Sequence, residues 1–404
     1  MAAAKEPEQV NLLNPAGPFS LSSPVRPVHK RYAAVAITRN GIMLAAKLGA
    51  ELSGTAVYGY AKYCGGLEGQ SGEIAAFDGP VRDLLPQLFR SYEAIILFFS
   101  LGAAVRLTAP LLGDKKTDPA VIVIDERGEH VISMLSGHLG GANRLTLQIA
   151  GLLGSHPVIT TASDVQGIFA VDLLGQEYGW RPDSFAGMKA VSAALVNGEP
   201  VAFVQESGER GWLPPGTVLP EHVRLFTDRE ELLGSGFSCP AAIIVTDRLL
   251  LEPEAAALPG STVVFRPRSL VLGLGCNRGT AAAELEAVVL HTLAELGLSL
   301  HSVRNAATAG IKGDEAGLLA LCAKYGWELE LYSPEQLNTI ALDNPSAAVF
   351  RATGAYGVCE PAALLSSGAG ELLLRKHKSG NVTIAVARVV HDVPCVKKGE
   401  SRHG

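Results

Sequence analysis

The chain has 404 residues, more than one ordinary hydrophobic core accommodates, so we expect two or three domains. Its 48% of hydrophobic residues and its 44 glycines are typical of an α/β protein with many strand-to-helix turns. The net charge of −6 argues against a general nucleic-acid binder, and no stretch is long and apolar enough to cross a bilayer.

The cysteines and the first residues of the chain indicate its compartment. Six cysteines lie far apart without a C-x-x-C pair, which favours reduced thiols over a disulfide framework or a structural zinc site. Glu6, Pro7 and Glu8 stand where a secretory signal would have a basic start followed by an apolar run. We therefore expect a cytoplasmic protein.

The first 164 residues divide into a tail and a domain. Residues 1–30 show no periodicity, and we expect them to form a mobile tail. Strand and helix patterns then alternate over residues 31–164, which predicts an N-terminal α/β domain. Within it, the apolar runs 121–124 and 130–135 are expected to form a hairpin.

The rest of the chain contains a weaker and then a stronger α/β pattern. Residues 165–267 indicate an intermediate region with strands at 201–205 and 242–246. Regular alternation resumes over residues 268–390 and predicts a C-terminal α/β domain, and residues 391–404 are read as a polar tail. The expected fold class is α/β, with two layered α/β domains joined by a smaller intermediate α/β region.

One glycine-rich turn follows the strand at 130–135 and precedes an apolar helix over 144–153. A turn of this kind exposes backbone N–H groups at the carboxyl edge of a parallel sheet, where open α/β folds bind ligands. The turn predicts substrate contacts from five residues around a histidine that can titrate near neutrality, His138: Ser136, Gly137, Gly140, Gly141 and Asn143. A tight turn carrying a surface histidine is the open alternative.

Polar residues at two further places of the N-terminal domain join this candidate site. Ser163 and Asp164 follow a strand, so that Asp164 either orients His138 or caps the next segment. Arg144 and Arg106 each lie in the first turns of a helix that follows a loop of the kind that binds ligands. Two arginines at the opening of one binding site would favour a ligand with several carboxylate groups. The loop before Arg106 contributes two more candidates, Ser100 and Gly102.

A second glycine-rich turn opens the C-terminal domain. Residues 273–279 have the spacing G-x-G-x-x-x-G, one residue longer than the dinucleotide fingerprint, and no P-loop motif occurs in the chain. What remains is a helix start beside Arg278 that suits a carboxylate or a phosphate. The turn supplies the candidates Gly275, Cys276, Gly279 and Thr280, although Cys276 also fits a buried apolar role.

Two later turns in the same domain repeat the theme. In Lys312-Gly313-Asp314-Glu315, Asp314 is a natural N-cap and Glu315 suits the helix dipole, which leaves Lys312 as the binding candidate. Thr353 and Gly354 are further binding candidates. Glu360 is either a first-turn charge or a general base.

Taken together, these motifs resemble the cobalt-precorrin-5A hydrolases of anaerobic cobalamin biosynthesis, over roughly residues 32–390. The resemblance rests on Ser136 to Asn143 with Ser163-Asp164, on Gly273-Leu274-Gly275-Cys276 with Arg278-Gly279-Thr280, on Lys312 to Leu318, and on Val358-Cys359-Glu360 with Ala362-Ala363-Leu364. The last domain also resembles a small stand-alone protein of the aerobic corrin pathway. Asn277 and Pro361 depart from the expected pattern, and Asn277 puts a two-arginine carboxylate clamp in doubt.

The resemblance implies a reaction and its reactants. Water would open the δ-lactone of cobalt-precorrin-5A, a polycarboxylate cobalt-corrinoid, and acetaldehyde would leave to give cobalt-precorrin-5B. His138 is the first choice of base, assisted by Asp164, with Glu360 as the alternative. Because the cobalt arrives inside the substrate, we expect no protein metal site and no cofactor. The sequence also allows a protein that binds corrinoids and carries them without catalysing a reaction. A homodimer and contacts with neighbouring corrin-pathway enzymes are further possibilities.

Overall fold

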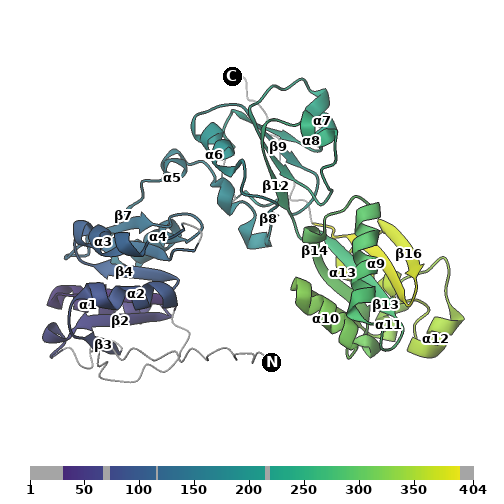
Figure 1. The fold of residues 1–404 in the computed structure, drawn as a ribbon, viewed down its shortest axis with the longest axis horizontal. Helices are drawn as coiled ribbons and strands as arrows, with labels where there is room; N and C mark the ends of the chain where they lie inside the picture. Colours follow the sequence, from purple (N-terminus) through teal and green to yellow (C-terminus); the bar gives the residue numbers. More distant parts are fainter. Residues whose placement is uncertain (1–30, 67–72, 115–116, 214–218, 392–404) are drawn as a thin grey trace, which may run out of the picture. The chain divides into compact units, whose positions relative to one another are not determined.

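The computed structural model describes residues 31–66, 73–114, 117–213 and 219–391 (Figure 1). The chain divides into two compact units, Met1–Gly167 and Ile168–Gly404. One sheet lies in the first unit and two lie in the second, and helices cover their faces, so the expected α/β class is confirmed. The tail expected at 1–30 lies outside the described residues, as does the tail expected at 391–404 except for His391.

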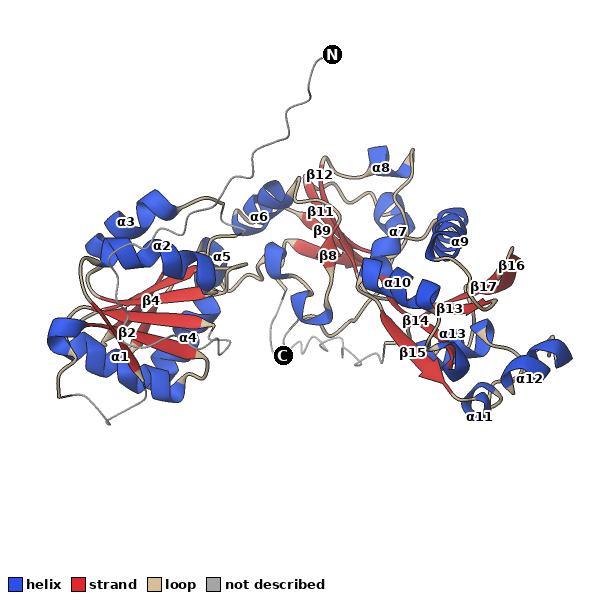
Figure 2. Cartoon of the chain, turned by 60° about the horizontal axis from the view of Figure 1, so that its bottom comes forward, coloured by secondary structure: helices blue, strands red, loops and turns tan. Residues whose placement is uncertain are grey.

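The first unit is a seven-stranded sheet between two pairs of helices. The strands have the order β3-β2-β1-β4-β5-β6-β7. Buried side chains of α1 and α4 pack on one face, and those of α2 and α3 pack on the other (Figure 2). The elements are β1 (Tyr32–Ala36), α1 (Arg39–Glu51), β2 (Thr55–Tyr60), β3 (Ile74–Phe77), α2 (Val81–Ser91), β4 (Ala94–Phe98), α3 (Leu101–Thr108), β5 (Ala120–Ile124), β6 (His130–Leu135), α4 (Ala142–Leu153), β7 (His156–Val158) and α5 (Ala162–Gln166).

The expected hairpin reverses the chain and thereby decides the location of the glycine-rich turn. Strand β6 runs antiparallel to β5, with Val121 opposite Leu135, and β7 runs parallel to β6. The carboxyl ends of β6 and β7 therefore lie at the edge where β1, β4 and β5 begin. The turn after β6 was expected at the carboxyl edge of the main parallel strands. That expectation was wrong, because the reversal carries the turn to the opposite edge.

The middle sheet occupies the start of the second unit. Its strand order is β10-β9-β11-β12-β8, parallel except for β8. The sequence predicted β9 and β11, whose five residues are all buried, but not β8, β10 and β12, each of which has residues that are not fully buried. The elements are β8 (Arg181–Pro182), α6 (Met188–Val196), β9 (Val201–Gln205), β10 (Val223–Phe226), α7 (Arg229–Gly234), β11 (Ala241–Val245), α8 (Glu254–Ala257) and β12 (Ser261–Arg266).

The C-terminal sheet has the order β15-β14-β13-β17-β16, in which β13, β14 and β15 are parallel. Helices α9 and α10 pack on each other beside the sheet, and α13 packs on β13 and β17. The elements are β13 (Leu270–Cys276), α9 (Ala282–Glu295), β14 (Val303–Ala309), α10 (Ala316–Tyr325), β15 (Glu328–Tyr332), α11 (Pro334–Leu337), α12 (Ala347–Thr353), α13 (Cys359–Ser367), β16 (Leu374–Ser379) and β17 (Val382–Arg388).

A buried carboxylate joins the middle and C-terminal sheets within the second unit. Asp247 is fully buried and accepts hydrogen bonds from Ser269 Oγ at 2.8 Å and from Arg388 Nε and Nη2 at 2.7 and 2.8 Å. Its backbone oxygen accepts from the N–H of Ser299 at 2.7 Å. Since a buried charge is tolerated only with such partners, this cluster fixes the junction of the two sheets.

The glycine at position 273 allows α13 to lie directly on β13. A Cβ placed there would come within 1.8 Å of the Cys359 carbonyl oxygen, at the first turn of α13. Pro361 lies in the same first turn, where a missing N–H costs no helical hydrogen bond. The first glycine of this turn therefore serves strand-to-helix packing.

We predict that Gly273→Ala destabilises the second unit by about 3 kcal/mol or more, at the upper end of overpacking, because backbone atoms have to move. Denaturant unfolding followed by circular dichroism measures the effect. Gly234→Ala is the matched control in the same unit, because a Cβ there meets nothing within 4 Å. The packing argument fails if both variants unfold at the wild-type midpoint.

Candidate active site

The turn between β6 and α4 is closed by its own backbone. Ser136 has a φ of 57°, and the N–H groups of Ala142 and Asn143 donate to the carbonyls of Ser136 and Gly137 at 3.1 and 3.0 Å. Residue 140 has to be glycine because a Cβ would lie 2.4 Å from Ser136 Cβ. The sequence Ser136 to Asn143 thus folds into a compact loop that carries His138 at this edge of the sheet.

His138 meets the polar residues that follow β7. Its Nε2 lies 3.0 Å from Asp164 Oδ2 and 3.2 Å from Ser163 Oγ. The His138 side chain is 20% exposed and that of Asp164 is 37% exposed, so the pair is accessible yet partly shielded. Two roles were considered for Asp164, and the structure shows its contact with His138. Asp164 does not cap α5, because it lies within this helix and Thr161 is the N-cap residue.

Asn143 forms hydrogen bonds with three polar side chains of this cluster. Its amide nitrogen donates to Asp164 Oδ2 at 3.0 Å and to Thr161 Oγ1 at 2.9 Å, and its amide oxygen accepts from Ser133 Oγ at 2.6 Å. The residue is 5% exposed. Because the amide fixes the Asp164 oxygen that contacts His138, Asn143 sets the geometry of the pair.

A hollow of about 560 Å³ lies beside the turn, on the same edge of the sheet. Gly140, Gly141 and Arg144 line it together with the ion pair of Arg31 and Glu93. Leu139 and Gly140 donate their N–H groups to no acceptor among the described residues. The edge therefore combines a histidine, a carboxylate, backbone donors and a cation.

Three predicted residues of the first unit lie elsewhere. Ser100 and Gly102 follow the carboxyl end of β4, and Arg106 lies in the last turn of α3. Since the turn after β6 is at the opposite edge of the sheet, Arg106 and Arg144 do not share one mouth. The expectation of a common arginine pair was wrong for this reason.

The C-terminal turns meet in a cluster of ion pairs. Arg278 Nη1 lies 2.5 Å from Asp314 Oδ1 and 3.2 Å from Glu315 Oε1, and Lys312 Nζ lies 3.0 Å from Glu315 Oε1. Glu315 is 3% exposed and also accepts from the N–H of Gly279 at 3.0 Å. Asp314 was expected to cap α10, but that helix begins at Ala316, and Asp314 pairs with Arg278 instead.

These ion pairs border a hollow of about 530 Å³ that Gly279 and Thr280 also line. Gly275 and Cys276 end β13 beneath the turn. Burial raises the pKa of the Cys276 thiol, which favours the apolar role of this residue over a nucleophilic one. Arg278 and Lys312 thus border this hollow as cations that already form ion pairs with Asp314 and Glu315.

The remaining candidates lie apart from the Arg278 cluster. Thr353 and Gly354 end α12, where the Gly354 carbonyl accepts from Asn338 Nδ2 at 2.9 Å. Glu360 lies in the first turn of α13, and its Oε1 accepts from the N–H of Lys376 at 3.1 Å. Neither group lines the hollow at Arg278.

Sequence reasoning left out two members of the site that the structure identifies. Ser133 interrupts an apolar strand, which was a detectable signal of a polar neighbour across the turn. Glu315 was read only as a helix-dipole charge, although it forms ion pairs with both Arg278 and Lys312. Within the described ranges, no three His, Cys, Asp or Glu side chains gather as a metal site, and no helix is long and apolar enough to span a membrane.

Comparison with known proteins gives consecutive matches. Family models described as Cobalamin synthesis G N-terminal, Cobalamin biosynthesis central region and Cobalamin synthesis G C-terminus match residues 83–164, 169–267 and 270–387. A cobalt-precorrin-5A hydrolase of Priestia megaterium is 51% identical over 361 residues, 89% of this chain and 96% of that protein. The cobalt-precorrin-5A hydrolase of Salmonella typhimurium is 34% identical over 77% of this chain and 86% of its own. The protein CobE of Sinorhizobium sp. is 36% identical over 29% of this chain and 79% of its own.

We predict that Asn143→Ala lowers the free energy of unfolding by about 1–3 kcal/mol, because it leaves the hydrogen-bonding groups of Ser133 and Asp164 unsatisfied. Gln148→Ala, an exposed change on the same helix, should stay within about 0.5 kcal/mol of wild type. Urea unfolding of both variants compares them. Equal stabilities would remove Asn143 from its role in the cluster.

The buried contacts of Glu315 lead us to predict that the free energy of unfolding depends on pH. The N–H of Gly279 and the ammonium of Lys312 hold the pKa of Glu315 below its usual value of 4.5. A lowered pKa in the folded state stabilises the protein above pH 4.5, and this contribution is lost as the pH falls. Glu315→Gln should therefore be less stable than wild type at pH 7, with the gap narrowing below pH 4.5.

Denaturant unfolding at several pH values measures that gap. Glu371→Gln is the control, because Glu371 is exposed and its charge faces solvent. A gap between wild type and Glu315→Gln that stays constant from pH 7 to pH 4 contradicts the ion-pair account.

Proposed function

Because this chain belongs to the cobalt-precorrin-5A hydrolase family, we propose that it opens the δ-lactone of cobalt-precorrin-5A at the cluster around His138 and releases acetaldehyde to give cobalt-precorrin-5B. Membership rests on the 51% identity over 96% of the Priestia megaterium protein, which confirms the resemblance seen in the motifs. The observation that carries the choice of site is the 3.0 Å contact of His138 Nε2 with Asp164 Oδ2.

His138 is proposed as the general base. When Nε2 carries a proton and donates it to Asp164, Nδ1 keeps the lone pair that can accept a proton from water. The water oxygen then bonds to the lactone carbonyl carbon and the ring C–O bond breaks, which leaves the two-carbon fragment as an alkoxide. This alkoxide becomes acetaldehyde when its C–C bond to the macrocycle breaks, and the electron pair of that bond stays on the macrocycle. The Asp164 carboxylate stabilises the imidazolium that forms, and Asn143 keeps that carboxylate in place.

Backbone and cationic groups supply the rest of the chemistry. The N–H groups of Leu139 and Gly140 are the proposed donors to the oxyanion that develops on the lactone. Arg144 lines the adjacent hollow, where it can bind a carboxylate arm of the substrate. These contacts would position the lactone for attack.

Arg278 and Lys312 are proposed as further carboxylate anchors that work by exchange. The Arg278–Asp314 pair is exposed, at 58% and 73% of the two side chains. Since an exposed ion pair contributes little stability, a substrate carboxylate can replace Asp314 at low cost. Glu315, which is buried, would keep both cations in place during the exchange.

Cobalt is proposed to enter only within the substrate, with no cofactor held by the protein. The cytoplasm is the proposed compartment, supported by the five described cysteines, all of which are unpaired: Cys64, Cys239, Cys276, Cys322 and Cys359.

Anaerobic incubation with cobalt-precorrin-5A, followed by assays of acetaldehyde and product mass, tests the proposal. His138→Ala should lower the turnover by about 10²–10⁴-fold, the usual contribution of a general base, while the protein stays folded. His156→Ala is the control, because His156 is an exposed histidine of the same unit and should leave turnover unchanged.

Two other outcomes would contradict the proposal. Full turnover in His138→Ala together with a large loss in Glu360→Gln would assign the base to Glu360. Binding of the substrate by wild type without any acetaldehyde would make the protein a carrier.

A further inference from the structure

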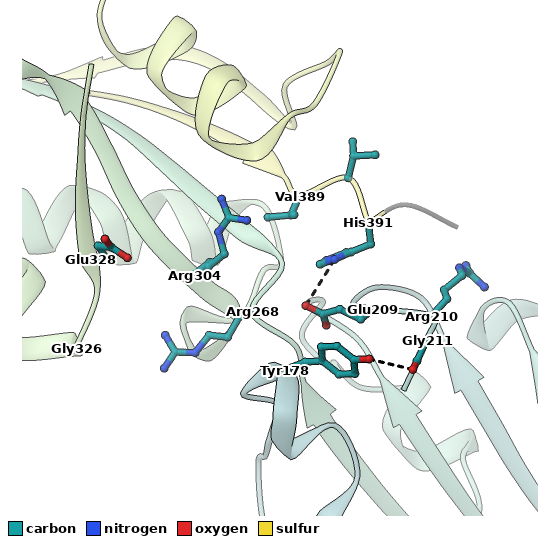
Figure 3. A pocket seen from close by; sticks show the side chains of 11 residues that line it. Tyr178, Glu209, Arg210, Gly211, Arg268, Arg304, Gly326, Glu328, Val389 and His391 are labelled. Atoms are coloured by element: carbon teal, nitrogen blue, oxygen red, sulfur yellow. Dashed lines mark hydrogen bonds and ion pairs between the residues drawn. The ribbon is translucent and has the colours of Figure 1, made fainter. Parts of the chain in front are cut away.

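A further hollow in the second unit is lined by none of the residues assigned above. It measures about 750 Å³ and opens where the middle sheet meets the C-terminal sheet (Figure 3). It adjoins the edge at which β14 and β15 begin, opposite the edge that carries Arg278 and Lys312. Six of the lining residues carry the argument: Glu209, Arg210, Arg268, Arg304, Glu328 and His391.

The lining is rich in guanidinium groups that have neutral partners. Arg268 donates to the Val303 carbonyl at 3.0 Å, and Arg304 donates to Asn305 Oδ1 at 2.9 Å and to the Ser366 carbonyl at 2.5 Å. Among the described residues, no carboxylate forms an ion pair with Arg210, Arg268 or Arg304. Three cations therefore face two carboxylates, Glu209 and Glu328, neither of which neutralises them directly.

Burial makes this arrangement costly at Arg268. The residue is half-buried, and burial together with the nearby charge of Arg181 lowers the pKa of its guanidinium. A cation in that position gains from any anion that comes within hydrogen-bonding distance. The walls thus favour a negatively charged occupant.

The other wall is fixed by a short chain of polar contacts. Trp180 Nε1 donates to Glu209 Oε2 at 2.6 Å, and Glu209 Oε1 lies 3.6 Å from His391 Nδ1. His391 Nε2 is buried and has no hydrogen-bond partner among the described residues. Figure 3 shows His391 and Glu209 pointing toward each other, and the side chains of Arg268 and Arg304 extending away from this pair. The imidazole therefore contributes one wall of the hollow through its contact with Glu209, and its buried Nε2 has no partner among the described residues.

We propose that this hollow binds a small dianion that carries carboxylate or phosphate groups, held by Arg268 and Arg304. Its volume falls within the range of about 300–1,000 Å³ usual for small-molecule sites. A guanidinium pairs with either kind of group through two parallel hydrogen bonds. The site is separate from the residues proposed for lactone opening.

Isothermal titration calorimetry of the full chain at low salt, with inorganic phosphate and with succinate as probes, tests this site. Wild type should bind at least one probe with an affinity that falls as salt is added. Arg304→Gln and Arg268→Gln should each weaken binding by at least about tenfold, because each removes a charged donor. Tighter binding of succinate would indicate a carboxylate ligand, and tighter binding of phosphate a phosphate ligand.

Three further variants keep the test decisive. Glu209→Gln should strengthen binding, because it removes a negative charge from the wall without removing an arginine. Arg351→Gln, an exposed arginine elsewhere in the same unit, and His138→Ala should bind as wild type does. Absence of heat with both probes, or equal affinities in wild type, Arg304→Gln and Glu209→Gln, overturns the proposal.

Discussion

The reversal of the chain between β5 and β6 is the constraint on which the candidate active site depends. Asp125 makes the turn: its carboxylate accepts from the N–H groups of Arg127 at 2.8 Å, His130 at 2.6 Å and Glu129 at 3.3 Å. Burial raises the pKa of Asp125, but these backbone donors outweigh it and lower the pKa. Since β6 then runs against β5, the turn that carries His138 and the segment that carries Asp164 emerge at the same sheet edge.

The polar cluster at that edge is held by buried hydrogen bonds. Asn143 is buried and uses its amide group for three contacts, each with a different part of the site. Because a buried amide has to be satisfied, the same bonds that stabilise the turn orient Asp164 toward His138. Asn143 thus links the stability of the turn to the geometry of the candidate site in the first unit. In the second unit, Glu315 forms ion pairs with both Arg278 and Lys312.

Local patterns predicted much of the fold and part of the site. The fully buried strands β9 and β11 and the glycine-rich turn follow from short stretches of sequence. The contact between His138 and Asp164 was one of two roles that the sequence left open for Asp164, and the structure shows it. The separation of Arg106 from Arg144 could not be predicted in this way. The hairpin reverses the strand direction, and only the assembled sheet shows that this places the two arginines at opposite edges. Likewise, Asp314 fits a cap by local rules, yet a residue 36 positions away, Arg278, pairs with it. The hollow at Arg268 and Arg304 is built from segments distant in sequence, and no motif announces it.

Chemical rescue tests the central claim, that an imidazole at position 138 activates water, most directly. The measurement is acetaldehyde release from cobalt-precorrin-5A by His138→Gly under anaerobic conditions, with and without added imidazole. The account predicts slow release that rises with imidazole concentration and saturates, while wild type does not respond. Release at the wild-type rate by His138→Gly, unchanged by imidazole, would contradict it.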